Sequence, residues 1–183
     1  MYNTWAPLQA VLNTGPHYIL EDQSIWTAPI DEFDIPCRVS EPMKAEFDIF
    51  PQEEGLLIRG KISGQVIVPC SRCSEEAAYD IRQEFDSFEP FPAEEEENAE
   101  PDLDVDEYFF RYSPQGTGLE VNLGALAWEE FAQALPVHPL CAQECAGLCP
   151  KCGKNLNQGG CECEKENFDP RMAQLSGLKI NKK

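Results

Sequence analysis

Eight of the nine cysteines in this chain lie close together in the sequence. They form a Cys-x-x-Cys pair and a longer run near the C-terminal end. The pair is Cys70 and Cys73, and the run is Cys141, Cys145, Cys149, Cys152, Cys161 and Cys163. Cysteines two or three residues apart on a tight turn can place two thiolates on one tetrahedral ion, at about 2.3 Å each. The spacing therefore predicts metal coordination.

Four members of the run have the arrangement of a complete zinc site. The segment 149–153, Cys-Pro-Lys-Cys-Gly, has the form of a zinc knuckle, and Gly153 can adopt the left-handed conformation that turns backbone amides toward sulfur. Cys161 and Cys163 are one residue apart, so in an extended segment both side chains reach one face. We therefore predict one zinc ion on Cys149, Cys152, Cys161 and Cys163.

The other four grouped cysteines could bind a second zinc ion. They are Cys70, Cys73, Cys141 and Cys145. They make a site only if the Cys-x-x-Cys pair and the start of the run meet in space, because a structural site needs four ligands. His138 could replace a thiolate, although a histidine so placed is more often a packed or surface residue. Cys37 stands alone after Pro36 and is expected to be a small buried hydrophobic residue.

A disulfide framework is the alternative use of clustered cysteines, and the cellular compartment distinguishes it from metal binding. A secreted chain would carry a signal peptide, but the first thirty residues have no basic segment and no apolar run. No segment approaches the ~20 apolar residues that span a membrane. We therefore expect a cytoplasmic protein with reduced thiols and no membrane partner.

Catalytic uses of the cysteines fit the sequence less well. Cys145, Cys149 and Cys152 have the spacing of a radical-enzyme iron–sulfur site, but too few residues follow them for a catalytic barrel. A thioredoxin-type pair opens a helix, whereas Cys73 precedes an alternating, strand-like pattern. No catalytic carboxylate pair, phosphate loop or nucleophile motif is visible. We expect no enzymatic activity and no small-molecule substrate; the alternatives are a thiol- or metal-dependent enzyme and a zinc-containing regulatory adaptor.

The charge of the chain is its second informative property. The net charge is -19 at pH 7, which disfavours nucleic-acid binding by charge alone. Residues 94–107 contain nine acids and no base, so 93–107 is expected to be a disordered acidic linker. From residue 149 onward seven bases outnumber four acids. Direct RNA contact could use the bases of this region. The alternative is that these bases only compensate the negative charge of the thiolates. They include Lys151, Lys154, Arg171, Lys179, Lys182 and Lys183.

The patterning of the remaining residues predicts an α+β fold, with an antiparallel β-rich core, one main helix and a C-terminal cysteine-rich zinc module. Alternating residues predict a meander of strands, with the Cys70 pair in a connection. The expected strand positions are 46–49, 56–58, 66–68 and 79–88, with further strands at 108–112 and 119–123. Helical spacing begins at Leu123, with Asn122 as N-cap and Pro136 as the stop. A short helix is expected from Asp169.

The chain has 183 residues and 42% apolar content, which is enough to bury one core. The patterns above divide it into four segments. Residues 1–92 hold an N-terminal segment and the β-rich core. Residues 93–107 are the acidic linker, residues 108–140 complete the core with strand and helix, and residues 141–183 form the zinc module and a short helix.

The motifs of residues 36–180 resemble the YceD family, also called DUF177. The resemblance rests on Val68 to Cys73, Ala134 to Cys141, Cys145 to Asn157, Cys161 to Cys163 and Asp169 to Leu175. Family members are bacterial and plastid proteins implicated in accumulation of 23S ribosomal RNA. The resemblance implies a non-enzymatic role in ribosome biogenesis, with precursor particles as partner through 23S rRNA or a basic ribosomal protein. Some members keep the first pair without the C-terminal cysteines, which argues against one metal shared by Cys70 and Cys149.

Overall fold

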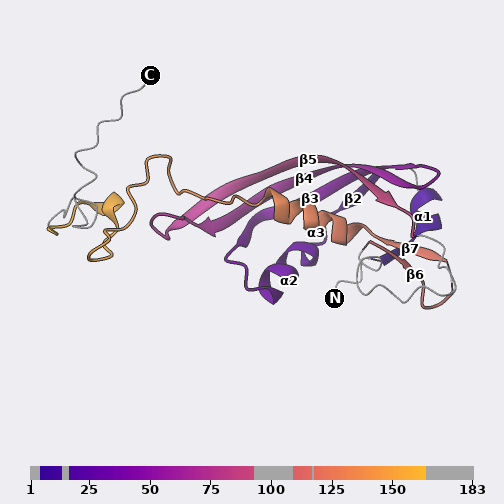
Figure 1. Cartoon of the computed structure of the whole chain (residues 1–183), viewed down its shortest axis with the longest axis horizontal. Helices are drawn as coiled ribbons and strands as arrows, with labels where there is room; N and C mark the ends of the chain where they lie inside the picture. Colours follow the sequence, from indigo (N-terminus) through magenta and orange to yellow (C-terminus); the bar gives the residue numbers. More distant parts are fainter. Residues whose placement is uncertain (1–4, 14–16, 93–108, 117, 164–183) are drawn as a thin grey trace, which may run out of the picture.

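A long antiparallel sheet is the main structural unit of the protein (Figure 1). The structure is a computed structural model that describes residues 5–13, 17–92, 109–116 and 118–163. The sheet has the order β2-β3-β4-β5, with β2 at His17–Leu20, β3 at Arg38–Pro51, β4 at Gly55–Pro69 and β5 at Glu76–Pro90. The predicted meander is confirmed. The apolar runs at 56–58 and 66–68 belong to one strand, because the residues between them keep the alternation of buried and exposed side chains.

One face of this sheet is buried and the other faces solvent. The buried face carries apolar side chains from β3, β4 and β5: Met43, Ala45, Phe47, Ile49, Ile58, Ile62, Val66 and Ile81. Residues between them, such as Arg59, Lys61 and Glu84, are exposed. This alternation is typical of an antiparallel sheet with one wet face.

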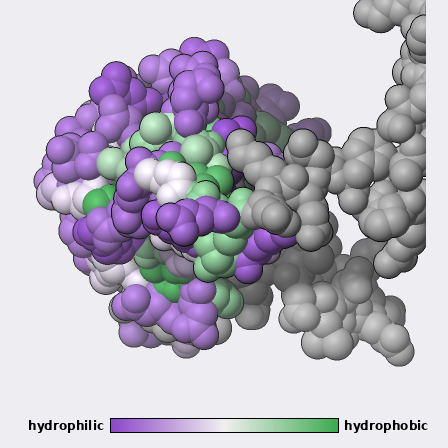
Figure 2. All heavy atoms as spheres, turned by 90° about the vertical axis from the view of Figure 1, so that its left-hand side faces the viewer, coloured by the Kyte–Doolittle hydropathy of each residue, from purple (hydrophilic) through white to green (hydrophobic). Residues whose placement is uncertain are grey.

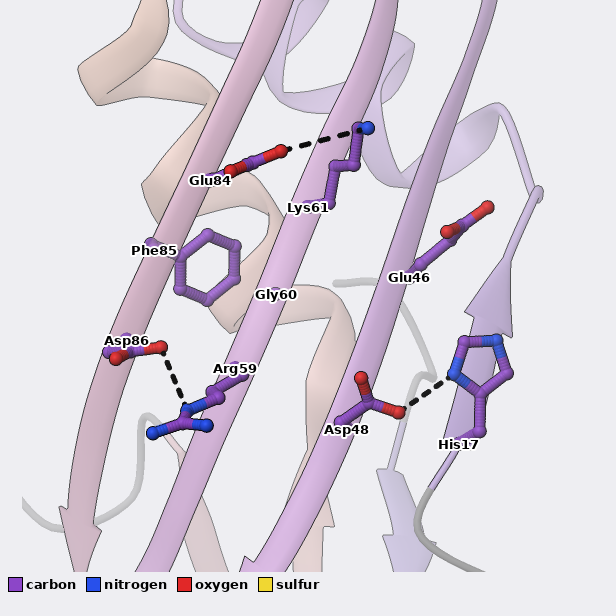
Figure 3. Close-up of a pocket in the computed structure, with 9 residues that line it drawn as sticks. All are labelled: His17, Glu46, Asp48, Arg59, Gly60, Lys61, Glu84, Phe85 and Asp86. Carbon is purple, nitrogen blue, oxygen red and sulfur yellow. Dashed lines mark hydrogen bonds and ion pairs between the residues drawn. The ribbon is translucent and has the colours of Figure 1, made fainter.

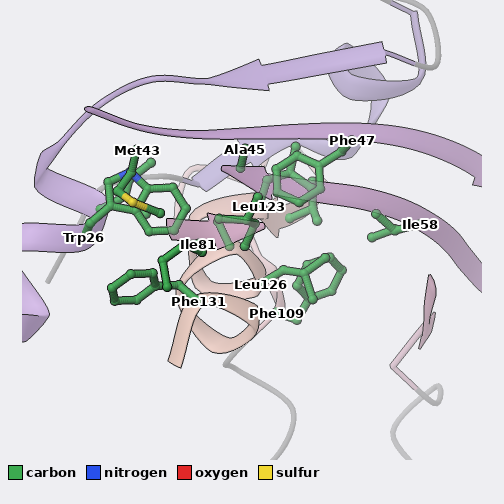
Figure 4. Packing of buried hydrophobic residues seen from close by; sticks show 14 of the residues in the cluster. Trp26, Met43, Ala45, Phe47, Ile58, Ile81, Phe109, Leu123, Leu126 and Phe131 are labelled. Atoms are coloured by element: carbon green, nitrogen blue, oxygen red, sulfur yellow. The ribbon is translucent and has the colours of Figure 1, made fainter. Parts of the chain in front are cut away.

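Two helices pack against each other in the buried core (Figure 4). Helix α3, Leu123–Ala134, has the predicted N-cap, since the Asn122 side chain accepts a hydrogen bond from the Ala125 amide at 3.0 Å. Helix α2, Ser24–Glu32, places Trp26 against Phe131 of α3 with ring centroids 5.6 Å apart. Of these two helices, the sequence predicted only α3. Helix α2 was missed because it is short and contains Pro29, which normally marks a helix end.

A smaller three-stranded sheet lies at one end of the long sheet (Figure 1). It has the order β1-β7-β6, with β1 at Trp5–Pro7, β7 at Leu119–Asn122 and β6 at Phe110–Tyr112, and helix α1 at Leu8–Asn13 beside it. The two strands expected around 108–112 and 119–123 are therefore confirmed. The rings of Phe91 and Phe110 lie 5.6 Å apart. The expected acidic linker and the helix expected from Asp169 lie outside the described residues.

The cysteine-rich segment lies at the opposite end of the long sheet, where β4 turns into β5 (Figure 1). Its described part contains one short helix, η1 at Leu156–Gln158. Viewed toward this end, hydrophilic residues surround smaller areas of hydrophobic ones (Figure 2). Among the helices that the structure describes, none is long and apolar enough to cross a membrane.

Candidate metal centres

Eight cysteines form two groups of four, and these are the candidate metal centres. Group A is Cys70, Cys73, Cys141 and Cys145, and group B is Cys149, Cys152, Cys161 and Cys163. Within each group all four sulfur atoms lie within 4.8 Å of one another. The Cys-x-x-Cys pair after β4 thus lies beside the start of the C-terminal run. This fulfils the condition stated above for a second metal site.

The sulfur positions of group A fit one tetrahedral ion. The Sγ atoms of Cys70 and Cys145 are 3.8 Å apart, and those of Cys73 and Cys141 are 3.5 Å apart. Metal–sulfur bonds of about 2.3 Å in tetrahedral geometry separate sulfur atoms by about 3.8 Å. Three of these four cysteines are buried, and Cys141 is exposed. Four thiolates at this spacing are a donor set for zinc or for iron–sulfur chemistry.

The same turn positions the first cysteine pair of each group. The Ser74 amide donates to the Cys70 carbonyl at 2.9 Å, and the Gly153 amide donates to the Cys149 carbonyl at 2.9 Å. Ser74 and Gly153 both have left-handed backbones, with φ of 60° and 71°. The conformation predicted for Gly153 is confirmed. Its equivalent at Ser74 was missed, because serine does not signal a positive φ.

Each turn is also closed by a second hydrogen bond. The Cys70 amide donates to the Glu75 carbonyl at 2.8 Å, and the Cys149 amide donates to the Lys154 carbonyl at 2.9 Å. The two segments are therefore copies of one knuckle, the first between strands β4 and β5 and the second in the C-terminal segment. Knuckles of this form are typical of structural zinc sites.

Backbone amides favour one thiolate in each group. Hydrogen bonds from amides, above all that of Cys141, lower the pKa of Cys70 to about 6. The amides of Cys152 and Lys151 likewise lower the pKa of Cys149 to about 6. A second thiolate beside the first is disfavoured, because the two negative charges repel each other.

The neighbouring sulfurs have the opposite effect on one other thiol of each group, Cys141 in group A and Cys163 in group B. Hydrogen bonding with the Cys73 sulfur, followed by that with the Cys145 sulfur, raises the pKa of Cys141 to about 12. Hydrogen bonding with the Cys152 sulfur raises the pKa of Cys163 to about 12. Four sulfurs this close cannot all be charged without a cation between them, and a bound divalent ion would supply that charge.

Arg72 attaches the C-terminal segment to the end of the sheet. Its Nη1 donates to the Cys145 carbonyl at 2.8 Å, and its own carbonyl accepts from the Leu148 amide at 3.1 Å. Gly147 has a φ of 73°, and a Cβ there would lie 3.2 Å from the Arg72 carbonyl. The Ser71 amide adds a hydrogen bond to the Pro139 carbonyl at 2.8 Å. The residues between Cys70 and Cys73 thus hold the group A ligands from the two segments together.

Two asparagines connect the loop of group B to group A and to the connection between β4 and β5. Asn157 lies between Cys152 and Cys161, yet its Nδ2 donates to the Cys145 sulfur of group A at 3.3 Å. Its Oδ1 accepts from the Ala146 amide at 2.8 Å. Asn155 Nδ2 donates to Glu75 Oε1 at 3.1 Å. Both asparagines lie in the motif that resembles the family, but we predicted no role for either from the sequence. Their position as polar side chains between candidate metal ligands could have indicated such hydrogen bonds.

The remaining predicted residues are placed as follows. His138 is exposed and belongs to neither four-cysteine group. Cys37 is buried in the main core, as predicted, and burial raises the pKa of its thiol. Lys154 Nζ donates to the Gly160 carbonyl at 2.8 Å, so this lysine also closes the group B loop. The basic residues from 165 onward lie outside the described residues.

Comparison with known proteins identifies the family of this chain. A family model described as "Large ribosomal RNA subunit accumulation protein YceD" matches residues 58–179, which is more than half of the chain. The chain belongs to the YceD family. The matched range contains all eight cysteines of groups A and B. Both groups therefore lie within the part of the chain that the family model matches.

Curated relatives resemble this YceD-family chain over most of its length. The large ribosomal RNA subunit accumulation protein YCED homolog 1, chloroplastic, of Arabidopsis thaliana is 23% identical over 75% of this chain and 49% of its own length. Uncharacterized proteins of Mycobacterium bovis and Mycobacterium tuberculosis are 29% identical over 67% of this chain and 55% of their own lengths. The chain thus spans about half the length of these relatives. No solved structure matches it significantly.

Proposed function

We propose that this chain is a non-enzymatic factor in ribosome biogenesis that supports the synthesis, processing or stability of 23S ribosomal RNA. The observation that carries the proposal is the YceD match, which covers both cysteine groups. The chloroplastic relative is also named for accumulation of the large ribosomal RNA subunit. In this proposal the protein acts in the cytoplasm on ribosomal precursor particles, through 23S rRNA or a basic ribosomal protein.

Zinc is the proposed metal in both groups, one ion in group A and one in group B. The donor sets support this assignment, because four cysteines at tetrahedral spacing are a recurring form of structural zinc site. Zinc would neutralise the thiolates and fasten the C-terminal segment. Few apolar side chains of the segment 141–163 are buried, so metal binding would supply much of its folding free energy.

The proposed organisation follows the four segments expected from the sequence. Residues 1–92 and 108–140 form the scaffold, which the pairing of β1 with β7 supports because it joins the two stretches. Residues 93–107 serve as an acidic linker. Residues 141–183 form the zinc module. The scaffold and the module then present surfaces to the precursor particle.

Deletion of the gene, with measurement of mature and precursor rRNA, tests this function. We expect a lower ratio of 23S to 16S rRNA, accumulation of large-subunit precursors, and recovery with the wild-type gene. Sedimentation should place the wild-type protein in the precursor fractions. An unchanged rRNA ratio in the deletion strain, together with no protein in those fractions, would contradict the proposal.

A further inference from the structure

Three apolar side chains lie in one row on the solvent face of the long sheet. Phe50 of β3 pairs with Leu57 of β4, and Leu57 pairs with Phe88 of β5. Directly paired residues share a face of the sheet, with Cβ atoms about 5 Å apart. Phe50 is 38% exposed, Phe88 is 50% exposed, and Leu57 is partly buried. The row is thus a contiguous apolar strip on a face that is otherwise largely polar.

Carboxylates surround this row. The next row along the same face is Asp48–Arg59–Asp86, and the one after it is Glu46–Lys61–Glu84 (Figure 3). The turn between β3 and β4 adds the exposed Glu53 and Glu54. This end of the face therefore carries six carboxylates against two cations, a net charge of -4, which becomes -3 when Lys44, 2.7 Å from Glu46, is counted.

The two cations within this surface are already engaged. Arg59 lies 3.4 Å from Asp86, and its guanidinium is 5.8 Å from the centre of the Phe50 ring. Lys61 lies 3.7 Å from Glu84. Each cation lies between two carboxylates in the register, so each row holds two acids and one base. Of the second carboxylates, Glu46 lies 2.7 Å from Lys44 and Asp48 lies 2.9 Å from His17. A surface depression of about 610 Å³ runs over these two rows.

We infer that this end of the solvent face is a docking surface for a basic polypeptide segment. The inference rests on the proposed function and selects a protein, not RNA, as the partner contacted here. An apolar side chain of the segment would cover the Phe50–Leu57–Phe88 row, while its lysines or arginines face the surrounding carboxylates. An apolar centre with a charged rim is the usual anatomy of a protein interface, and opposite charge speeds association.

The charge of this surface argues against RNA as its ligand. RNA binding requires a basic patch for the phosphates, whereas this end of the face is negative. The charge along this face becomes positive only at the row Lys44–Ser63–Arg82, beyond the two acidic rows. A segment centred on Phe50 and Phe88 therefore lies beside Asp48, Asp86 and the two acids of the turn, with Arg59 as the one cation among them.

Photo-crosslinking from the surface tests the inference. The full zinc-loaded chain carries benzoylphenylalanine in place of Phe88 and is incubated with purified precursor particles of the large ribosomal subunit. We expect a crosslink that protease removes and ribonuclease does not, to a lysine- or arginine-rich peptide. A crosslink to RNA, a crosslink to an acidic peptide, or no crosslink overturns the inference.

Variants with matched controls provide the second measurement. Phe50→Ser/Phe88→Ser and Glu53→Gln/Glu54→Gln should each weaken particle binding by at least about tenfold, and the second should also reduce the salt dependence of binding. Phe33→Ser alters a side chain that is 65% exposed on another part of the molecule, and Asp31→Asn/Glu41→Gln removes exposed carboxylates elsewhere. These controls should bind like the wild type. Circular dichroism checks the fold of every variant.

The outcomes separate this inference from the proposed function. If the row and turn variants bind particles and restore 23S rRNA as well as the controls do, the docking surface is wrong and the proposed function stands. If the wild-type chain neither binds particles nor affects 23S rRNA, the proposed function is wrong.

Discussion

The side-chain amide of Asn157, in the loop of group B, donates a hydrogen bond to the sulfur of Cys145 in group A at 3.3 Å. Asn157 lies in the loop that brings the two cysteine pairs of group B together, and Cys145 is a member of group A. This hydrogen bond is the main cause of the lowered pKa of Cys145. Closure of the group B loop therefore positions a donor that stabilises a group A thiolate.

Asn157→Ala should weaken metal binding at group A more than at group B. Loss of a hydrogen bond to a metal ligand typically lowers metal affinity by about 10- to 100-fold. Cobalt titration, followed through the sulfur-to-cobalt absorption bands, measures the two binding steps separately. Gln158→Ala is the control, because Gln158 lies on the same turn but contacts Glu75 at 3.3 Å and not a cysteine. Equal loss of affinity in both variants would show that the effect is one of loop structure alone.

Elemental analysis of the purified wild-type chain should find two zinc ions. Cys73→Ser and Cys152→Ser should each reduce this number to one, because each removes a ligand from a different four-cysteine group. Cys37→Ser is the control and should keep both ions, since Cys37 belongs to the main core. A single ion in the wild-type chain, or visible absorption typical of iron–sulfur clusters, would contradict the assignment.

The two ligand variants should differ in which part of the chain becomes exposed to hydrogen exchange. Cys73→Ser breaks the link between the sheet and the C-terminal segment, so exchange should rise throughout 141–163. Cys152→Ser should raise exchange mainly in 149–163. Strands β3 to β5 should stay protected in both variants, because their core is apolar and contains neither cysteine group. Equal loss of protection in the sheet would mean that metal organises the whole fold.

Zinc affinity should fall as the pH falls, because protons compete with zinc for the thiolates. Cys70 and Cys149 have a pKa of about 6 and are largely ionised at pH 7, whereas Cys141 and Cys163, with a pKa of about 12, must lose protons on binding. Affinity should therefore fall at least about tenfold per pH unit near pH 7. The fall should steepen below pH 6, where Cys70 and Cys149 also gain protons. Competition with a chromophoric chelator between pH 5 and pH 8 measures this dependence, and a flat profile would refute it.

Gly60→Ala should destabilise the sheet by about 1 to 3 kcal/mol through overpacking. A Cβ at this position would overlap the ring of Phe85, which lies on the paired position of β5 and packs against Phe47 with centroids 6.1 Å apart. Urea unfolding measures the change. In a Phe85→Ala background the same substitution should cost little, because the ring is gone. Gly160→Ala is the control, since a Cβ there meets no atom within 4 Å.

Local patterns were sufficient to predict many elements of the fold. The alternation in β3 to β5 and the helical spacing and N-cap of α3 are properties of neighbouring residues, so they are visible in the sequence. Helices α1 and α2 are short, and α2 contains Pro29. Helix α2 is held by contacts such as that of Trp26 with Phe131, which lies more than one hundred residues away in the chain, and helix α1 packs against β1 and β7. Such contacts leave no periodic signal in a short segment.

The same division applies to the candidate site. The grouping of Cys149, Cys152, Cys161 and Cys163 was predictable from the sequence, because the four ligands lie close together in one segment of the chain. The folded structure was needed to show that Cys70 meets Cys145, 75 residues further along the chain. It also decided that Phe50, Leu57 and Phe88 form one exposed row, because strand register sets which distant residues become neighbours. Residue types and local spacing specify the chemistry that is available, whereas chain topology specifies which of these groups act together.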